Sequence, residues 1–217
     1  ALEGADRVLD SARELARAGR HLSAAALALC AIREITVLLD GSDDSDGYVG
    51  DALEDALDMI REAARAQSVP PAGREKLFDL LLGESARPCY ESEMRLSLLQ
   101  SCAEIVPNAP ALRARLEERL SSLRAELGGS AWSRAYFEEN LDLIRYGMIE
   151  KLDGEARAAA FVRERLGYPR FRQIAIESAM QSGAYAEAAG LALDGETQHR
   201  DSPGLVTRWK EYRLQTY

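Results

Sequence analysis

Hydrophobic residues recur at spacings of three and four positions along most of the chain. Near the N-terminus this spacing places Val8, Leu9, Ala12, Leu15 and Ala16 on one face of a helix. The pattern continues through further segments that end at glycines or prolines. The chain contains no long run of alternating apolar and polar residues, so nothing indicates a β-strand. We therefore predict an all-α fold of about ten helices.

The length of 217 residues suits one domain or two small ones. Glycines at positions 128 and 129 separate two helical regions, and Ser130 is suited to cap the helix that follows. We expect domains of residues 1–127 and 130–217, with one continuous domain of residues 1–217 as the alternative. The last four helices are expected at residues 153–166, 168–182, 184–194 and 204–215, with Gly195 ending the third of them.

Two segments that start 164 residues apart, 18–29 and 182–193, match without a gap. They share Gly19/Gly183, Ala24/Ala188, Ala25/Ala189, Leu27/Leu191, Ala28/Ala192 and Leu29/Leu193. In each, the glycine frees a turn between two helices, and His21 or Tyr185 is expected to pack into the crease. The pattern resembles the inter-helix turn of tetratricopeptide (TPR) repeats, although no 34-residue period connects the copies. It favours stacked antiparallel helical hairpins, TPR-like or α-solenoid-like, without a regular TPR array.

The formal net charge is −9, and the acidic excess lies near the N-terminus. Residues 1–112 hold 20 acidic and 11 basic side chains, whereas residues 113–217 hold 16 of each. Such a field repels duplex nucleic acid and anionic membranes. The chain has no segment of about 18 consecutive apolar residues, so we expect no membrane partner.

An acidic turn, residues 40–47, follows the second predicted helix, and its later part contains Asp43, Asp44 and Asp46. It superficially resembles the start of a calcium-binding loop. With Gly47 in the sixth position the twelfth is Leu53, where that loop requires a glutamate. We therefore expect Ser45 or Asp46 to cap the helix that begins near Tyr48, and expect no metal. A metal-dependent enzyme that uses the three aspartates is a weaker alternative.

Other motifs for catalysis are missing from the sequence. It contains two histidines, His21 and His199, and no phosphate-binding loop, nucleophile elbow or His-Glu-Xaa-Xaa-His motif. Its three cysteines, Cys30, Cys89 and Cys102, form no Cys-Xaa-Xaa-Cys pair. Their odd number is typical of reduced thiols in a cytoplasmic protein. We expect no cofactor, and an enzyme is the less favoured interpretation.

Several short stretches together suggest a family. Residues 43–50, the segment 183–189, residues 204–212 and the final Tyr217 resemble the helical region of uncharacterised bacterial proteins, some of which are associated with SWIM zinc fingers. The resemblance implies a helical-repeat region without an assigned function. The zinc-finger motif itself, Cys-Xaa-Cys followed by Cys-Xaa-His, is absent from this chain. Because the chain does not begin with Met, we treat it as a possible fragment of a longer protein.

These observations favour a non-catalytic helical scaffold that binds a protein or peptide in the cytoplasm. The candidate contacts are aromatic and basic side chains beside the acidic turn and near the C-terminus: Tyr48, Arg208, Trp209, Tyr212 and Tyr217. For each of them, packing in the core or a solvated position is the alternative.

Nucleic-acid binding is the alternative from a different functional class. It would use a cluster of arginines interleaved with aromatic residues, Arg163, Arg165, Tyr168, Arg170, Phe171 and Arg172. Arginines bind phosphates and aromatic rings stack on bases, but the acidic net charge of the chain disfavours this interpretation.

Overall fold

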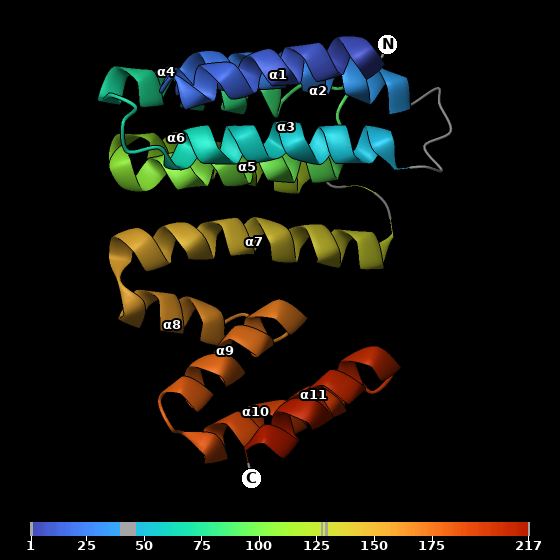
Figure 1. Ribbon diagram of the computed structural model, residues 1–217. Helices are drawn as coiled ribbons and strands as arrows, with labels where there is room; N and C mark the ends of the chain where they lie inside the picture. The colour runs from blue at the N-terminus through green and yellow to red at the C-terminus, as the bar shows by residue number, and fades with distance from the viewer. Residues whose placement is uncertain (1, 40–46, 127, 129, 217) are drawn as a thin grey trace. The chain divides into compact units, whose positions relative to one another are not determined.

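The computed structural model describes residues 2–39, 47–126, 128 and 130–216. These residues form eleven α-helices and two short 3-10 turns, and they contain no strand, which confirms the all-α prediction (Figure 1). The helices are α1 (Leu2–Arg17), α2 (His21–Leu39), α3 (Tyr48–Arg65), α4 (Pro71–Glu84), α5 (Ser92–Ile105), α6 (Arg113–Glu126), α7 (Ala131–Asp153), α8 (Glu155–Arg163), α9 (Pro169–Gln181), α10 (Tyr185–Gln198) and α11 (Pro203–Gln215). No described helix combines the length and the apolar character needed to cross a bilayer.

The chain forms two compact units. The N-terminal unit, Ala1–Leu127, contains α1 to α6, and the C-terminal unit, Gly128–Tyr217, contains α7 to α11. In the N-terminal unit α2 packs against both α1 and α3. Four of its five alanines and both of its isoleucines are buried on several faces, as its largely apolar sequence requires.

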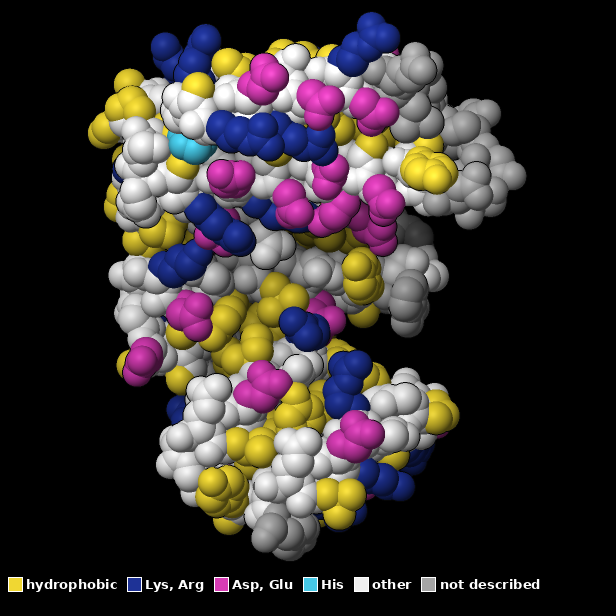
Figure 2. All heavy atoms as spheres, in the orientation of Figure 1, with side chains coloured by type: hydrophobic (Ala, Val, Ile, Leu, Met, Phe, Trp, Pro, Cys, Tyr) yellow, Lys and Arg dark blue, Asp and Glu magenta, His cyan; other side chains and the backbone are white. Residues whose placement is uncertain are grey.

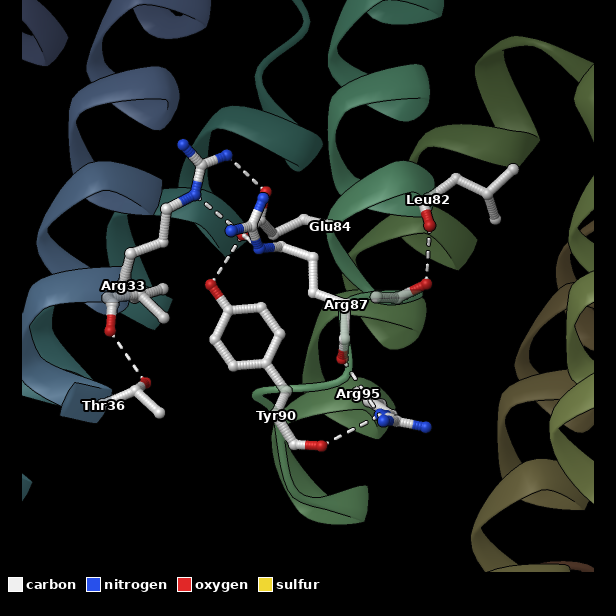
Figure 3. A network of polar contacts seen from close by, with 9 residues as sticks. Arg33, Thr36, Leu82, Glu84, Arg87, Tyr90 and Arg95 are labelled. Carbon is white, nitrogen blue, oxygen red and sulfur yellow. Dashed lines mark hydrogen bonds and ion pairs between the residues drawn. The ribbon is translucent and has the colours of Figure 1, made fainter. Parts of the chain in front are cut away.

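A buried carboxylate joins three elements of the N-terminal unit (Figure 3). Glu84, the last residue of α4, is only 4% exposed. Its carboxylate accepts hydrogen bonds from Arg33 Nε at 2.8 Å, from a second nitrogen of the same guanidinium, and from the Tyr90 hydroxyl at 2.7 Å. Arg87 Nε lies 3.2 Å from the same carboxylate. Burial acts to raise the pKa of Glu84, but the hydrogen bonds from Arg33 and Tyr90 outweigh it and hold that pKa below its ordinary value.

In the C-terminal unit, α9 and α11 both pack on α10. Each is joined to α10 by a short turn, so α9 and α11 run in the same direction (Figure 1). Their shared core is a cluster of buried side chains, Ile176, Ala179, Ala188, Ala192 and Trp209. The alanines let the helices approach closely, and the indole fills the space between them. Hydrophobic side chains also gather on part of the visible surface of this unit, between charged ones (Figure 2).

The two turns that match in sequence have the same backbone structure. Gly19 and Gly183 both adopt a left-handed conformation, with φ of 73° and 76°. The next amide nitrogen bonds back to the carbonyl five residues earlier at 2.8 Å in both turns, and the glycine nitrogen bonds to the carbonyl three residues earlier. Each turn is therefore a Schellman motif, which needs a residue that tolerates positive φ at this position.

The side chains around these turns are only partly equivalent. Ala24 and its match Ala188 are both fully buried. Tyr185, however, is 51% exposed, so the expectation that it fills the crease is wrong. Leu193 is 49% exposed, whereas its match Leu29 is 2% exposed, because α2 also packs against α4 in addition to the helices before and after it.

The predicted end of α10 needs correction. Helix α10 continues through Gly195 to Gln198, whereas the sequence pattern predicts an end at Gly195. Gly195 is buried, and a Cβ atom there would lie 2.7 Å from Arg172 Cδ and 3.0 Å from the Trp209 ring. This glycine is a packing residue, because only a backbone without a side chain leaves room for the indole.

One of the two predicted helix caps lies among the described residues. Ser130 Oγ accepts a hydrogen bond from the backbone nitrogen of Ser133 at 3.1 Å, which confirms it as the cap of α7. Helix α3 begins directly after Gly47, and the residues expected to cap it are Ser45 or Asp46. Both of those residues lie outside the described part of the chain.

Substituting Gly195 with Ala tests the packing of the indole. We expect G195A to destabilise the C-terminal unit by about 1–3 kcal/mol, since the added methyl overpacks the site. Gly190 on the same helix provides a matched control, because a Cβ atom added there would point into open space. G190A should stabilise the helix by about 0.5–1 kcal/mol. Urea unfolding followed by Trp209 fluorescence in a W132F background measures both, and equal stabilisation by the two variants would contradict the packing.

Substituting Glu84 with Gln tests the buried carboxylate. We expect E84Q to cost about 2 kcal/mol at pH 7, because a neutral amide cannot replace charge-assisted hydrogen bonds to Arg33. Since the folded-state pKa of Glu84 is lowered, its contribution is complete above its unfolded pKa of about 4.3 and disappears as the pH falls through the folded-state pKa. Denaturant titrations between pH 7 and 3 should therefore show a shrinking difference between the wild type and E84Q.

The exposed Glu91 supplies the control for this titration, because E91Q removes a carboxylate that forms no ion pair with the described residues. Its effect should stay within about 0.5 kcal/mol at every pH. A difference between wild type and E84Q that does not change with pH would refute the role assigned to the charge.

Candidate functional site

A polar groove of about 610 Å³ lies between α9 and α11. It is lined from α9 by Arg170, Gln173 and Glu177 and from α11 by Arg208, Glu211 and Tyr212. The spacings of three, four and seven residues put each set on one face of its helix. Arg170 lies in the first turn of α9, where the helix dipole adds a positive potential, whereas Arg208 lies near the middle of α11.

A chain of hydrogen bonds crosses the groove. Arg170 Nη1 donates to Gln173 Oε1 at 3.3 Å, and Gln173 Nε2 donates to Glu177 Oε1 at 2.9 Å. The Tyr212 hydroxyl of α11 donates to the same Glu177 oxygen. Burial and this hydrogen bond raise the pKa of Tyr212 to about 12, so the phenol stays protonated and keeps its role as a donor. Glu177 Oε1 thus already accepts two hydrogen bonds, one from Gln173 of α9 and one from Tyr212 of α11.

Four other side chains of the groove form no hydrogen bond or ion pair with the described residues. Arg208 and Glu211 are exposed and form no hydrogen bond or ion pair with the described residues. Gln181 and Gln215 line the other end of the groove, and their side-chain amides also form no hydrogen bond within the described part of the chain. The groove therefore offers a free cation, a free anion and two free amides to a ligand.

The groove wall formed by α11 rests on a buried indole. Trp209 has no exposed surface, and its ring stacks on Tyr212 with centroids 6.3 Å apart and planes 26° apart. The indole Nε1 donates to His199 Nδ1 at 3.0 Å. The sequence makes Trp209 a candidate contact, but the structure assigns it to the core, where it supports Tyr212 and does not itself meet a partner.

The other predicted contacts fall in different units or outside the described residues. Arg208 and Tyr212 come together in the groove. Tyr48 is 70% exposed at the first position of α3, in the N-terminal unit. Tyr217 lies outside the described residues, as do the aspartates of the acidic turn, Asp43, Asp44 and Asp46.

The six residues proposed for nucleic-acid binding do not form one surface, and this corrects the sequence interpretation. Phe171 is fully buried and Arg172 is 4% exposed, so neither can stack on a base or reach a phosphate. Arg165 Nε pairs with Asp142 at 2.9 Å, and its guanidinium lies over the Phe161 ring. Arg165 and Arg172 are therefore structural residues.

The remaining members of that set point to different partners. The Tyr168 hydroxyl donates to Glu138 at 3.0 Å, and the backbone nitrogen of Arg170 donates to Glu139 at 2.6 Å. Burial raises the pKa of Glu139 above its ordinary value. Arg163 is exposed on α8. Carboxylates of α7 therefore bind Arg165, the Tyr168 hydroxyl and the Arg170 backbone, which the local sequence of the cluster does not reveal.

A second hollow, of about 520 Å³, lies in the N-terminal unit and is lined by His21, Asp58, Arg61, Glu62 and Arg65 among others. Its two arginines are already paired: Arg61 Nη1 lies 2.7 Å from Glu54 and 2.6 Å from Asp58. Arg65 is 3.5 Å from Glu104. Within the described ranges, no group of three or more His, Cys, Asp or Glu side chains could hold a metal ion. The groove between α9 and α11 is therefore the better candidate for a ligand site.

Comparisons with known proteins add no further constraint. No protein-family model matches the chain, and neither a curated protein nor a solved structure is significantly similar to it. The resemblance to the SWIM-associated helical proteins stays a prediction, as does the likeness to TPR hairpins.

Sequence reasoning missed the polar stripe of α9, formed by Gln173, Glu177 and Gln181. Its signal was present, because these residues follow one another at intervals of four. What the sequence lacked was any indication that this stripe faces Arg208 and Tyr212, since helical periodicity says which face of a helix is polar and not which helix lies opposite.

Proposed function

We propose that the protein is a non-catalytic helical scaffold with TPR-like hairpins, and that the groove between α9 and α11 holds a segment of a protein partner. One observation carries the proposal: four groove side chains, Arg208, Glu211, Gln181 and Gln215, have no partner among the described residues. A polar side chain without an intramolecular hydrogen bond or ion pair can bind a ligand without the free-energy cost of breaking such an interaction.

The chemistry of the groove favours a peptide segment over a nucleic acid. Arg170 and Arg208 are balanced by Glu177 and Glu211, so the groove has no net charge with which to attract a polyphosphate backbone. Glutamine amides both donate and accept, which suits the N–H and C=O groups of a peptide main chain. A partner segment with side chains of both charge signs complements Arg208 and Glu211.

The groove is also preorganised. The Tyr212–Glu177 hydrogen bond joins its two walls, and the buried Trp209 fixes α11 on α10. A site whose walls are already ordered loses less conformational entropy when a ligand binds.

A cytoplasmic location is part of the proposal. Cys30, Cys89 and Cys102 are all free thiols in the structure, and two of them are exposed. Exposed free thiols persist in a reducing compartment.

Affinity capture with charge-reversal variants tests the groove. The full chain is used as bait in nuclease-treated lysate of the source organism, beside R208E and a matched control, K210E, which reverses an exposed charge on the same helix outside the groove. We expect proteins that are retained by the wild type and K210E but reduced at least about tenfold by R208E, which corresponds to about 1.4 kcal/mol.

Equal retention by all three baits, or no specific retention at all, would contradict a partner site in the groove. Retention that depends on the omission of nuclease would favour the nucleic-acid alternative. The E211R variant gives an independent test, since it should weaken the same interaction through the opposite charge.

A further inference from the structure

His199, the residue that follows α10, is held by the indole that anchors α11. Its Nδ1 accepts the Trp209 Nε1–H bond at 3.0 Å, and the two ring centroids are 5.8 Å apart. Since an indole nitrogen can only donate, Nδ1 must be an unprotonated acceptor. The imidazole is therefore neutral in this arrangement, with its single proton on Nε2.

The surroundings of His199 are positively charged. From α9, the buried guanidinium of Arg172 donates to the Leu191 carbonyl at 2.8 Å and to Gln198 Oε1 at 2.5 Å. From the turn before α9, the Gly167 carbonyl accepts a hydrogen bond from Gln198 at 3.1 Å.

The carboxylates near this site are engaged elsewhere. The negative charge of Asp194 of α10 interacts with the Arg172 guanidinium. Glu196 of α10 forms an ion pair with Arg213 of α11 at 3.0 Å. Arg200, next to His199, lies 3.7 Å from Asp201, and both are exposed. No carboxylate in the described part of the chain bonds to His199.

These surroundings disfavour an imidazolium ion. Burial lowers the pKa of His199, and the charge of Arg172 lowers it further, whereas the backbone carbonyls of Gly167 and Gly195 act in the opposite direction. The net direction is downward, so the neutral ring observed in the hydrogen bond is the form that the site stabilises.

The attachment of α11 depends on this indole. Trp209 is the one fully buried side chain among the described residues of α11, and Leu205 and Tyr212 are only partly buried against the same cluster. Tyr212, one turn further along, forms the wall of the groove and stacks on the indole. A change at Trp209 is thus transmitted to the groove through direct contact.

We propose that His199 is a proton-sensitive latch: its protonation breaks the bond to Trp209, loosens α11 from α10, and opens the wall of the α9/α11 groove. Protonation places an N–H group opposite the indole N–H, so two donors face each other, and it adds a second cation beside Arg172. The loosening of α11 stands without the proposed function, whereas its effect on a partner rests on that function.

The sign of the pH dependence follows from linkage. The folded-state pKa of His199 lies below the unfolded value of about 6.5, so the unfolded chain binds more protons between the two values. The stability that the neutral imidazole contributes is complete above about pH 6.5 and declines as the pH falls toward the folded-state pKa. Acid therefore opens the latch, and neutral pH closes it.

Nuclear magnetic resonance of the full chain tests the latch directly. The protein has two tryptophans and two histidines, so W132F and H21N leave single reporters at Trp209 and His199. Between pH 7.5 and 5 we expect the Trp209 indole N–H proton to move upfield as its hydrogen bond is lost. This shift should follow the same one-proton titration as the His199 imidazole carbon-bound protons, with a midpoint below about 6.5.

Two variants separate the latch from general acid effects. H199N places a neutral amide oxygen near the position of Nδ1, so it keeps an acceptor but cannot titrate, and its indole signal should not change over this pH range. W209F keeps an aromatic ring but lacks the donor, so the midpoint of His199 should rise toward about 6.5. The wild-type titration remains decisive even where a variant fails to fold.

The proposal is overturned if the Trp209 signal stays constant while His199 titrates, if His199 remains neutral down to pH 5, or if H199N shows the wild-type shift. None of these readouts involves a partner. The absence of a groove partner would therefore not contradict the proposed role of His199. A failed titration, in turn, would not contradict the proposal that the groove binds a partner.

Discussion

The packing of one indole against one glycine determines the structure of the C-terminal unit. Trp209 of α11 reaches Gly195 of α10 so closely that a methyl group there would overlap its ring and Arg172 of α9. Three helices therefore meet at this point, and each must contribute a particular shape: an indole, an absent side chain and a long aliphatic stem. The direction of α11, and with it the width of the groove, follows from that fit.

Buried charges are satisfied by different means in the two units. Glu84 in the N-terminal unit is surrounded by cationic donors, so its charge is compensated as well as hydrogen-bonded. Arg172 in the C-terminal unit instead donates to a backbone carbonyl and to a glutamine amide, which leaves much of its charge uncompensated. Burial accordingly lowers the pKa of Arg172. Burial lowers the pKa of the neighbouring His199, and the charge of Arg172 lowers it further, so this site disfavours a second cation.

The helices were predictable because their causes are local. Apolar spacing, proline at the starts of α4, α9 and α11, and the serine cap of α7 all act within a few residues. The shared turn of Gly19 and Gly183 was also visible, because positive φ selects glycine. Gly195 shows the limit of this reasoning: from the sequence it resembles a helix terminator, and only the indole of a residue 14 positions later explains it.

The candidate site was less predictable than the helices, because it depends on contacts between residues that are distant in the sequence. Arg208 and Tyr212 could be selected as polar and aromatic residues near the C-terminus, but their pairing with α9 is a tertiary property. The arginine cluster failed as a predicted surface because its partners, Asp142, Glu138 and Glu139, lie on α7, more than twenty residues upstream. The sequence shows which charged residues the chain contains, but only the tertiary structure shows which of them can contact a ligand.

Amide hydrogen exchange of the full chain at neutral pH tests the central claim most directly. If Trp209 fixes α11 on α10, the amides of residues 188–195 and 207–212 should exchange slowly and with similar protection, because opening one helix exposes the core of the other. Fast exchange throughout residues 203–215 beside a protected α10 would contradict the account, since α11 would then not be held by its indole.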